Sequence, residues 1–496
     1  MLRRLIIYGP MVWLVAACGS DGNNGTDPGR PDASPPTSYS DPLTAVDSLA
    51  IGITDGTSGI EEMHALPDGR IVYCTSQSGV HVIDASDPAD LTRAMQIDTG
   101  PCQHLAVSGD ILYVSHRGDV NLPESRIRAW DLSQAVPDII GTFTKTDTFF
   151  EGIAADGNMI YAAARENGIL ILERNGNQIA ERGSLSTGFV NAWTVAVSGT
   201  TLYVADAGAG VAVIDIVNPD LPTQRGSTND EEANTISGAP MSLAVEGTTV
   251  YVGAGYGGIA VVDAGDPTNP LVRSQTSTSG FVLQVAYQNG FLHAANWSDV
   301  RVFDMSEPAA PVLVATERLP SQAGPSRVRA LAARGSNVFV GEWNGLHSYT
   351  LHAGRTAPDI WTQESEVSFF HVEPGRTKAY ALAVRNNGTA PLVASIELQG
   401  EAFSIDGNEL DIQPNATAAV EISYRATASF PDQGKLTISS ADPDQGIYEI
   451  PLLGNGPTLK VGDKVPEIAV ALLYGGEWRA NQQLGKIQVL SYFAVF

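Results

Sequence analysis

One short pattern recurs along most of this 496-residue chain, and it constrains the fold more than any other feature. Copies such as GDILYVS, GNMIYAA, GTTLYVA and GTTVYVG follow one another at intervals of 40 to 48 residues. One position of each copy is aromatic, or leucine in a single copy: Tyr73, Tyr113, Tyr161, Tyr203, Tyr251, Leu292 and Phe339. A repeat of this length indicates a propeller or a solenoid.

The composition of each repeat decides between these two architectures. A repeat contains an apolar run, a glycine turn, the strand described above, a second apolar strand such as GVHVID or GVAVID, and a more polar segment after a proline turn. Four strands per unit without helical periodicity are typical of a propeller blade. We therefore predict an all-β chain with a seven-bladed β-propeller over residues 45–354.

The two ends of this propeller predict how the ring closes. The last repeat, residues 328–351, contains only three strands, whereas residues 45–53 have the polar β character of an outer strand. We expect residues 45–53 to complete the last blade, because this pairing leaves no open sheet edge.

The turn after the third strand carries an aspartate in five repeats, at Asp84, Asp131, Asp215, Asp263 and Asp304. A short carboxylate in a turn accepts hydrogen bonds from backbone amides two residues on, so we expect capping rather than calcium binding. The segments VHVIDASDP and IAVVDAGDPTNP resemble the LVIVD repeat of bacterial and archaeal secreted or surface proteins. The resemblance covers residues 46–354.

One face of the predicted propeller gathers histidines, aromatic residues and charges of both signs. These residues come from loops that lead into the inner strands or join the second and third strands: His64, His104, His116, Glu151, Trp193, Trp297, Arg327 and Trp343. Concave surfaces of mixed chemistry usually bind ligands, so we predict an unidentified protein or small molecule as the partner. The histidine spacing matches no metal motif, and we predict no metal and no cofactor.

The first residues predict export and lipid anchoring. Arg3 and Arg4 precede an apolar stretch, and the string VAAC ending at Cys18 resembles the lipobox of bacterial lipoproteins. This resemblance implies a signal over residues 1–18 and a lipid on Cys18. Residues 19–44 have the composition of a flexible linker. We expect a protein of the bacterial cell envelope, on the outer membrane or cell surface, held by its lipid alone.

Charge and cysteine content limit the partners further. The formal net charge is −26, and an acidic surface repels phosphate backbones, so we predict no nucleic-acid partner. Apart from Cys18, the cysteines are Cys74 and Cys102. In an oxidising compartment they can form a disulfide, and two buried unpaired thiols are the equal alternative.

Two further regions follow the repeats. Residues 355–456 alternate apolar and polar positions between turns, which predicts a two-sheet sandwich. The strings NNGTAPL, IQPNATAAVEISYRA and IPLLGNG resemble the immunoglobulin-like modules of the ASH/Hydin group, which serve as spacers or protein-binding units. Residues 457–496, with VGDKVP, GK and YFAVF, resemble the start of a redoxin domain of the thioredoxin fold, and we expect the chain to end before the redox cysteine.

Together these features favour a lipid-anchored binding protein that is not catalytic as given. A thiol-disulfide or peroxide oxidoreductase with an incomplete redoxin domain is one alternative. A hydrolase or lyase with its site on the propeller face is another, because the fold does not determine activity.

Overall fold

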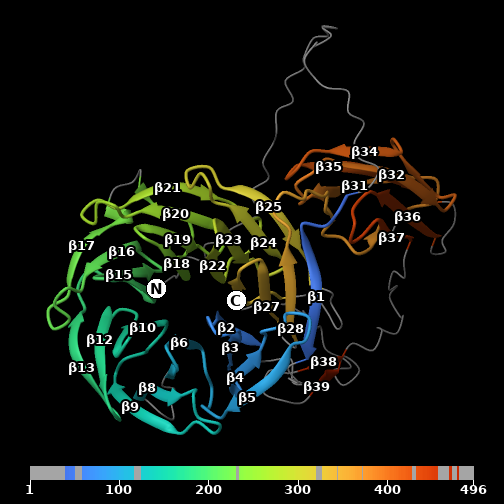
Figure 1. The fold of residues 1–496 in the computed structure, drawn as a ribbon. Coiled ribbons are helices and arrows are strands. Elements are labelled where there is room, and N and C mark those ends of the chain that lie inside the picture. Colours follow the sequence, from blue (N-terminus) through green and yellow to red (C-terminus); the bar gives the residue numbers. More distant parts are fainter. Residues whose placement is uncertain are drawn as a thin grey trace, which may run out of the picture. The chain divides into compact units, whose positions relative to one another are not determined.

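The computed structural model describes residues 39–50, 59–116, 124–230, 234–319, 327–342, 345–370, 372–426, 432–455, 469–471 and 477–479. The predictions for the signal, for Cys18 and for most of the linker and the redoxin-like segment lie outside these residues. The described residues form strands, turns and one short 3₁₀ helix, η1 (Thr228–Asp230) (Figure 1). No helix in this part of the chain is long and apolar enough to cross a membrane.

Four-stranded antiparallel sheets follow one another around a common centre (Figure 1). The first contains, from the centre outward, β2 (Ile60–Ala65), β3 (Arg70–Thr75), β4 (Gly79–Asp84) and β5 (Thr92–Ile97). Another contains β14 (Ala192–Ser198), β15 (Thr201–Asp206), β16 (Gly210–Asp215) and β17 (Thr223–Ser227). The next contains β18 (Ser242–Glu246), β19 (Thr249–Gly253), β20 (Ile259–Asp263) and β21 (Leu271–Thr276). It is followed by β22 (Gln284–Gln288), β23 (Phe291–Ala295), β24 (Val300–Asp304) and β25 (Val312–Glu317).

Two of the repeats share one sheet, which the sequence did not predict. One half contains β6 (His104–Ser108), β7 (Ile111–His116), β8 (Glu124–Asp131) and β9 (Ile139–Thr146). The other half contains β10 (Ile153–Asp156), β11 (Met159–Ala163), β12 (Ile169–Asn175) and β13 (Gln178–Leu185). A single parallel pairing between Thr142 of β9 and Gln178 of β13 joins the halves at their outer edges.

The ring closes between segments from opposite ends of the repeat region. The last repeat supplies β26 (Ala330–Arg334), β27 (Asn337–Gly341) and β28 (Gly345–Leu351), and β1 (Leu43–Ala50) pairs antiparallel with β28. This confirms the predicted pairing for the described part of residues 45–53, although the strand begins two residues earlier. Each innermost strand contacts the next, from β2 through β6, β10, β14, β18 and β22 to β26, which contacts β2 again. The first region is therefore a β-propeller.

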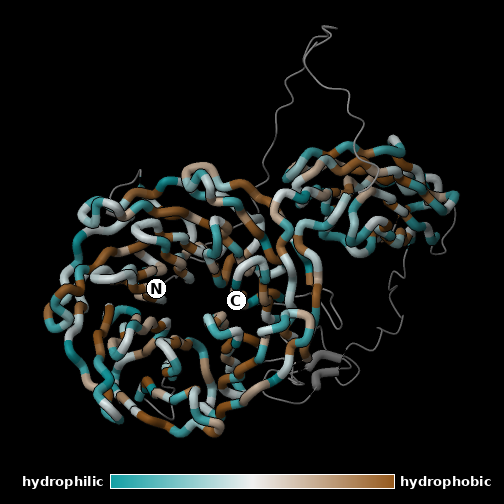
Figure 2. The backbone as a smooth tube through the Cα atoms, in the orientation of Figure 1, coloured by the Kyte–Doolittle hydropathy of each residue, from teal (hydrophilic) through white to brown (hydrophobic). Residues whose placement is uncertain are grey.

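The repeated aromatic position forms the packing between neighbouring sheets. Tyr73, Tyr113 and Phe339 are fully buried. The cluster of Tyr73 and Phe339 spans two adjacent sheets, and that of Tyr113 spans the two halves of the eight-stranded sheet. Both faces of a sheet are covered by its neighbours, so the central strands are apolar at almost every position. Figure 2 shows these hydrophobic stretches within the ring and more hydrophilic residues at many of its loops. Each repeat thus supplies an aromatic or leucine side chain that packs between neighbouring repeats.

The aspartates of the repeated turn cap the backbone, as predicted. Each accepts a hydrogen bond from the amide two residues on, at 3.0 Å for Asp84, 2.9 Å for Asp131, 2.9 Å for Asp215, 2.8 Å for Asp263 and 2.8 Å for Asp304. In the first turn, the hydrogen bonds from the Ser86 hydroxyl and the Ser86 amide lower the pKa of Asp84.

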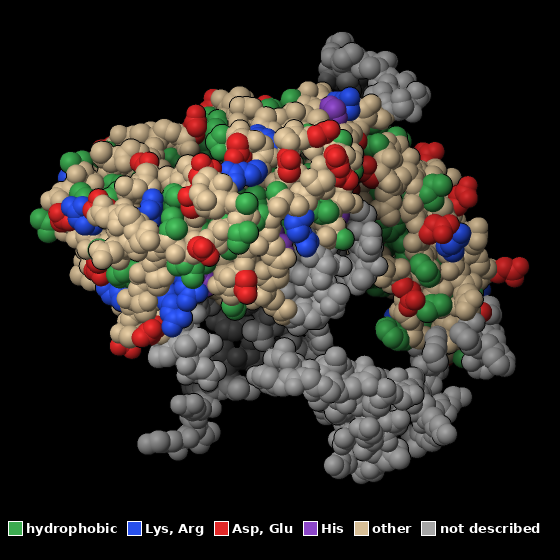
Figure 3. Space-filling view, turned by 60° about the horizontal axis from the view of Figure 1, so that its bottom comes forward, with side chains coloured by type: hydrophobic (Ala, Val, Ile, Leu, Met, Phe, Trp, Pro, Cys, Tyr) green, Lys and Arg blue, Asp and Glu red, His purple; other side chains and the backbone are tan. Residues whose placement is uncertain are grey.

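Charged side chains of both signs are interspersed on the face of the molecule in Figure 3. Ion pairs between neighbouring repeats include Arg182 with Asp220 at 2.7 Å and Lys145 with Glu181 at 2.7 Å. Exposed pairs of this kind contribute about 0–1 kcal/mol each to the free energy of unfolding, so they add little to stability.

After the ring, residues 357–455 form two sheets packed face to face. One contains β29 (Ile360–Trp361), β31 (Thr377–Asn386), β35 (Thr417–Arg425) and β33 (Phe403–Ile405). The other contains β30 (Val367–Ser368), β37 (Ile447–Gly454), β36 (Asp432–Ser440), β32 (Leu392–Gln399) and β34 (Glu409–Ile412). The region is a β-sandwich.

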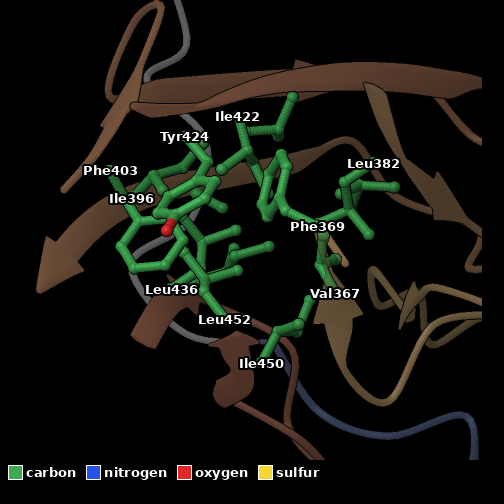
Figure 4. Packing of buried hydrophobic residues seen from close by; sticks show 14 of the residues in the cluster. Val367, Phe369, Leu382, Ile396, Phe403, Ile422, Tyr424, Leu436, Ile450 and Leu452 are labelled. Atoms are coloured by element: carbon green, nitrogen blue, oxygen red, sulfur yellow. The ribbon is translucent and has the colours of Figure 1, made fainter. Parts of the chain in front are cut away.

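A single aromatic core holds the two sheets of the sandwich together (Figure 4). The rings of Phe369 and Phe403 lie 5.4 Å and 5.1 Å from that of Tyr424, centroid to centroid. The Tyr424 hydroxyl reaches the edge of the core and donates to Asp432 at 2.6 Å. In β32, buried and exposed residues alternate, which is the pattern that the sequence indicated.

Of residues 457–496, the structure describes only the short antiparallel pair β38 (Ala469–Ala471) and β39 (Glu477–Arg479). The motifs that resemble a redoxin lie outside the described residues, so that interpretation stays a prediction.

Candidate functional site

The inner strands of the propeller enclose a central cavity of about 400 Å³. Alanine and valine side chains line much of it, because the inner strands approach one another closely at the axis. At the end where these strands begin, the lining is polar and includes Glu61, Glu62, His64 and His104. We call this end, together with the contacting Glu151, Arg165 and Trp193, the channel mouth.

Glu62 holds two histidines at the channel mouth. Its Oε1 lies 3.2 Å from Nε2 of His64, and its Oε2 lies 3.2 Å from Nδ1 of His104. The backbone amide of Leu105 also donates to Oε2, at 2.8 Å. Burial alone would raise the pKa of Glu62, but the hydrogen bonds and positive charge of His104 and His64 lower it to about 2. Glu62 is therefore a fixed negative charge that aligns both imidazoles.

Glu151 continues the same network into the neighbouring repeat. Its side chain is fully buried, and its Oε1 accepts a hydrogen bond from Nε of Arg165 at 2.5 Å. Its Oε2 lies 4.0 Å from Nε2 of His104, so His104 stands between two carboxylates. The edge of Trp193 meets the His104 ring, with the centroids 6.4 Å apart. Four successive repeats thus contribute to one polar surface.

Two β-bulges and one residue with positive φ determine where side chains of the channel mouth point. The pairing of β2 with β3 shifts register between Ile60 and Glu62, and that of β14 with β15 shifts between Ala192 and Thr194. A β-bulge redirects side chains, so the bulges allow Glu61 and Trp193 to face the mouth beside their neighbours. Arg165 has a φ of 51° and exchanges backbone hydrogen bonds with Ala192 at 3.0 Å and 3.1 Å. That exchange joins one repeat to the next and fixes where the guanidinium can reach.

On the opposite side of the ring, an equivalent loop presents Trp297. Trp297 has a φ of 61°, and its carbonyl accepts a hydrogen bond from the Val328 amide at 2.7 Å. The guanidinium of Arg327 lies over the indole, 5.3 Å from its centroid. Next to this pair in sequence, Arg329 forms an ion pair with Glu61. The Trp297 and Arg327 pair is a second cationic and aromatic feature, contributed by the loops rather than by the inner strands.

The structure brings several of the residues proposed from the sequence into contact, while their role in binding stays a prediction. The structure joins His64, His104, Glu151 and Trp193 in one network and pairs Trp297 with Arg327. Trp343 lies outside the described residues. Glu61 was not predicted, because the bulge that turns it toward Arg329 has no signal in the sequence.

His116, which the sequence analysis grouped with the other histidines, makes different contacts. Side chains alternate along a strand, and it is the preceding Ser115 that reaches Glu151, whose carbonyl accepts a hydrogen bond from Oγ at 3.0 Å. His116 points to the other face of β7, where its Nδ1 lies 3.0 Å from the Pro101 carbonyl and its ring meets Trp130. Burial lowers the pKa of His116 to about 4.

Cys74 and Cys102 are neighbours directly beneath the channel mouth. Both are fully buried thiols within one hydrophobic cluster, and the Cys102 amide donates to the Thr75 carbonyl at 3.1 Å. Burial raises the pKa of both thiols. The structure has them in the unpaired form, and a disulfide between them stays a prediction.

Comparison with known proteins identifies two segments of the chain. The profile of the LVIVD repeat matches residues 191–230 and 237–278, within β14–β21 of the propeller. The profile described as Cep192 domain 4 matches residues 357–457, which coincide with the sandwich. No curated protein sequence matches the chain.

Several solved propeller structures are similar to the ring. The WD40 β-propeller domain of Doa1 is 13% identical with a TM-score of 0.48, and the match covers 63% of this chain and 98% of that one. The WD40 repeats of RRP9 are 13% identical with a TM-score of 0.49, covering 62% of this chain and all of that one. U3-55K is 13% identical with a TM-score of 0.49, over 62% of this chain and 98% of that one. The profile match and the closed ring of inner strands show that the chain contains LVIVD repeats within a β-propeller.

Proposed function

We propose that this protein is a binding protein of the cell envelope that recognises a polar ligand, or the polar side chains of a partner protein, at the channel mouth. The observation that carries the proposal is the network from Glu62 through His104 to Glu151 and Arg165. It lies beside a cavity of about 400 Å³, within the size range of small-ligand sites.

The chemistry of the mouth favours binding over covalent catalysis. Its groups are carboxylates, imidazoles and guanidinium groups, which bind charged or hydrogen-bonding groups, and Trp193 adds an aromatic surface. The carboxylates and their cationic partners already compensate one another. A ligand with both a hydrogen-bond donor and an acceptor could therefore replace these contacts without leaving a charged group unpaired.

The same proposal extends to the architecture around the site. We regard the ring as a seven-bladed propeller, counting the eight-stranded sheet as two blades, and the sandwich as an immunoglobulin-like spacer. A lipid on Cys18 and the part of the linker that precedes β1 would hold both at the membrane surface. The aromatic core of the sandwich and its match to residues 357–457 support an independent module.

Site-specific photo-crosslinking tests the binding site. A benzophenone amino acid replaces Trp193 at the mouth in one variant and Thr223 in β17, an exposed outer-strand position, in another. After irradiation of cells that produce the protein, mass spectrometry of the purified chain should find adducts at position 193 and not at 223. Adducts of equal yield at both positions would overturn the proposal.

A charge-neutral substitution tests the role of the network. Glu62→Gln removes the negative charge that aligns His64 and His104, and loss of charged hydrogen bonds of this kind should reduce crosslinking about tenfold or more. Ser108→Ala at the far end of β6 is the matched control and should leave the yield unchanged. The anchoring part is tested separately by Cys18→Ser, which should abolish lipid labelling and partitioning into detergent.

A further inference from the structure

Three carboxylates from distant parts of the chain meet away from the channel mouth. Asp41 precedes the ring-closing strand β1, Glu317 ends β25, and Asp444 lies in the turn between β36 and β37 of the sandwich. One oxygen of each lies within 4.8 Å of the others. Oxygens on opposite sides of a Ca²⁺ ion stand about 4.6–5.2 Å apart, since each Ca²⁺–oxygen distance is 2.3–2.6 Å.

Glu317 supplies an independent indication that something is bound there. Its side chain is only 9% exposed, and its Oε2 has no hydrogen-bond partner among the described residues. A buried carboxylate oxygen without a partner is costly, because it has lost its water and gained nothing in exchange.

The surroundings add negative charge more than they remove it. Asp359 has a buried Oδ2 without a hydrogen-bond partner among the described residues. The carboxylate of Asp442 accepts hydrogen bonds from backbone amides of its own turn. Arg355 donates to the backbone carbonyl of Asp41 rather than to its carboxylate. The guanidinium of Arg318 lies over the Trp361 ring, 5.6 Å from its centroid. The carboxylates therefore need either shared protons or a bound cation to lie so close together.

A small cavity at the same place has room for one ion or water molecule. It measures about 10 Å³ and is lined by Asp41, Asp359, Asp444 and eight other residues, among them Ala315 and Thr316 of β25. Glu317 follows Thr316 in the chain and is not part of the lining. A ligand set made only of oxygens suits hard cations such as Ca²⁺ and is unfavourable for softer transition metals.

We propose that Asp41, Glu317 and Asp444 bind a Ca²⁺ ion, with Asp359 beside it. The ion would join the segment that closes the ring, the last strand of the preceding sheet and a turn of the sandwich. Such a site has a structural consequence, because Asp41 is two residues from the start of β1 and its Oδ1 already accepts from the Leu43 amide at 2.9 Å. Binding would hold β1 in place from its first residue.

Calcium binding to the full chain tests the proposal. The purified protein is stripped with EDTA, and calcium is returned during equilibrium dialysis with a radioactive tracer and during thermal melting. We expect one ion per chain at saturation and a higher melting temperature with calcium than with EDTA. Glu317→Gln and Asp444→Asn should each weaken calcium binding at least tenfold and remove the rise in melting temperature. Asp411→Asn, at an exposed position in β34, is the matched control and should change neither.

Shared protons are the competing explanation, and the same measurements distinguish it. If the carboxylates share protons, neutral amides relieve the repulsion, so both variants would melt higher than the parent at pH 7. Calcium would then shift no melting temperature, and this result would overturn the proposal. Asp444 is exposed, so its variant should fold even if Glu317→Gln does not.

Discussion

The propeller and the sandwich solve the same packing problem in different ways. The ring distributes its apolar residues over separate clusters between neighbouring repeats, and several of these clusters contain a repeated position such as Tyr73 or Tyr203. The sandwich concentrates them in one core around Phe369 and Tyr424. A ring of sheets leaves an axis where strands begin together, whereas two stacked sheets leave none. Polar side chains of several repeats therefore meet at the channel mouth, whereas the core between the two sheets of the sandwich is hydrophobic.

The sandwich should be the more sensitive region to a single core substitution. Phe369→Ala removes a fully buried ring that contacts Tyr424 and Phe403, and we expect a loss of about 3–5 kcal/mol. Hydrogen exchange should accelerate throughout the strands of the sandwich and stay unchanged in the ring. Faster exchange in both regions would mean that they unfold as one cooperative unit.

The ring should respond to loss of its closing contact. Leu43 in β1 is fully buried among residues of β24–β28, and Leu43→Ala should cost about 2–5 kcal/mol. Exchange should increase first in β28 and β27, because β1 protects the outer edge of that sheet. Ser48→Ala, an exposed position of the same strand, is the control and should change stability by less than about 0.5 kcal/mol. A Leu43→Ala protein with unchanged melting would contradict the closure.

Acid should destabilise the ring more than the sandwich. Burial lowers the pKa of His293 in β23 to about 4, against about 6.5 in an unfolded chain. The unfolded state therefore binds the proton first, and stability that is complete above pH 6.5 is lost as the pH falls toward 4. For one such histidine the loss is on the order of 3 kcal/mol.

A substitution separates this effect from general acid denaturation. His81 and His116 of the ring have pKa values lowered to about 4 by burial as well. His293→Leu should therefore reduce the slope of stability against pH between 6.5 and 4 by about a third, as chemical denaturation at several pH values would measure. An identical slope in parent and variant would show that His293 is not kept neutral by burial.

The repeated turns should contribute least. Asp304→Ala removes one hydrogen bond, to the Ser306 amide, and should cost about 0.5–1.5 kcal/mol. The loss should be the same with EDTA and with calcium, because the carboxylate caps backbone. A loss seen only in the presence of calcium would mean that these turns bind the ion after all.

Much of the ring could be predicted, because the same sequence pattern recurs in each repeat. A buried aromatic residue, a glycine turn and a capping aspartate recur in the sequence and occupy equivalent positions in the structure. The polar strand before the first repeat pairs with β28, as expected. The convergence of His64, His104 and Glu151 followed from their positions in equivalent loops. His116 lies apart from these residues and packs on Trp130, because one step along a strand reverses the face of a side chain.

The sequence by itself determined the local periodicities of this protein: the strands, the turns, the capping aspartates and the alternation within the sandwich. Only the tertiary structure decided which residues from different repeats meet. A bulge turns Glu61 to Arg329, one parallel pairing merges two repeats at Gln178, and Asp41 meets Glu317 across the ring closure. The physical reason is that periodicity depends on residues close together in the chain. These contacts depend instead on how complete sheets pack against one another.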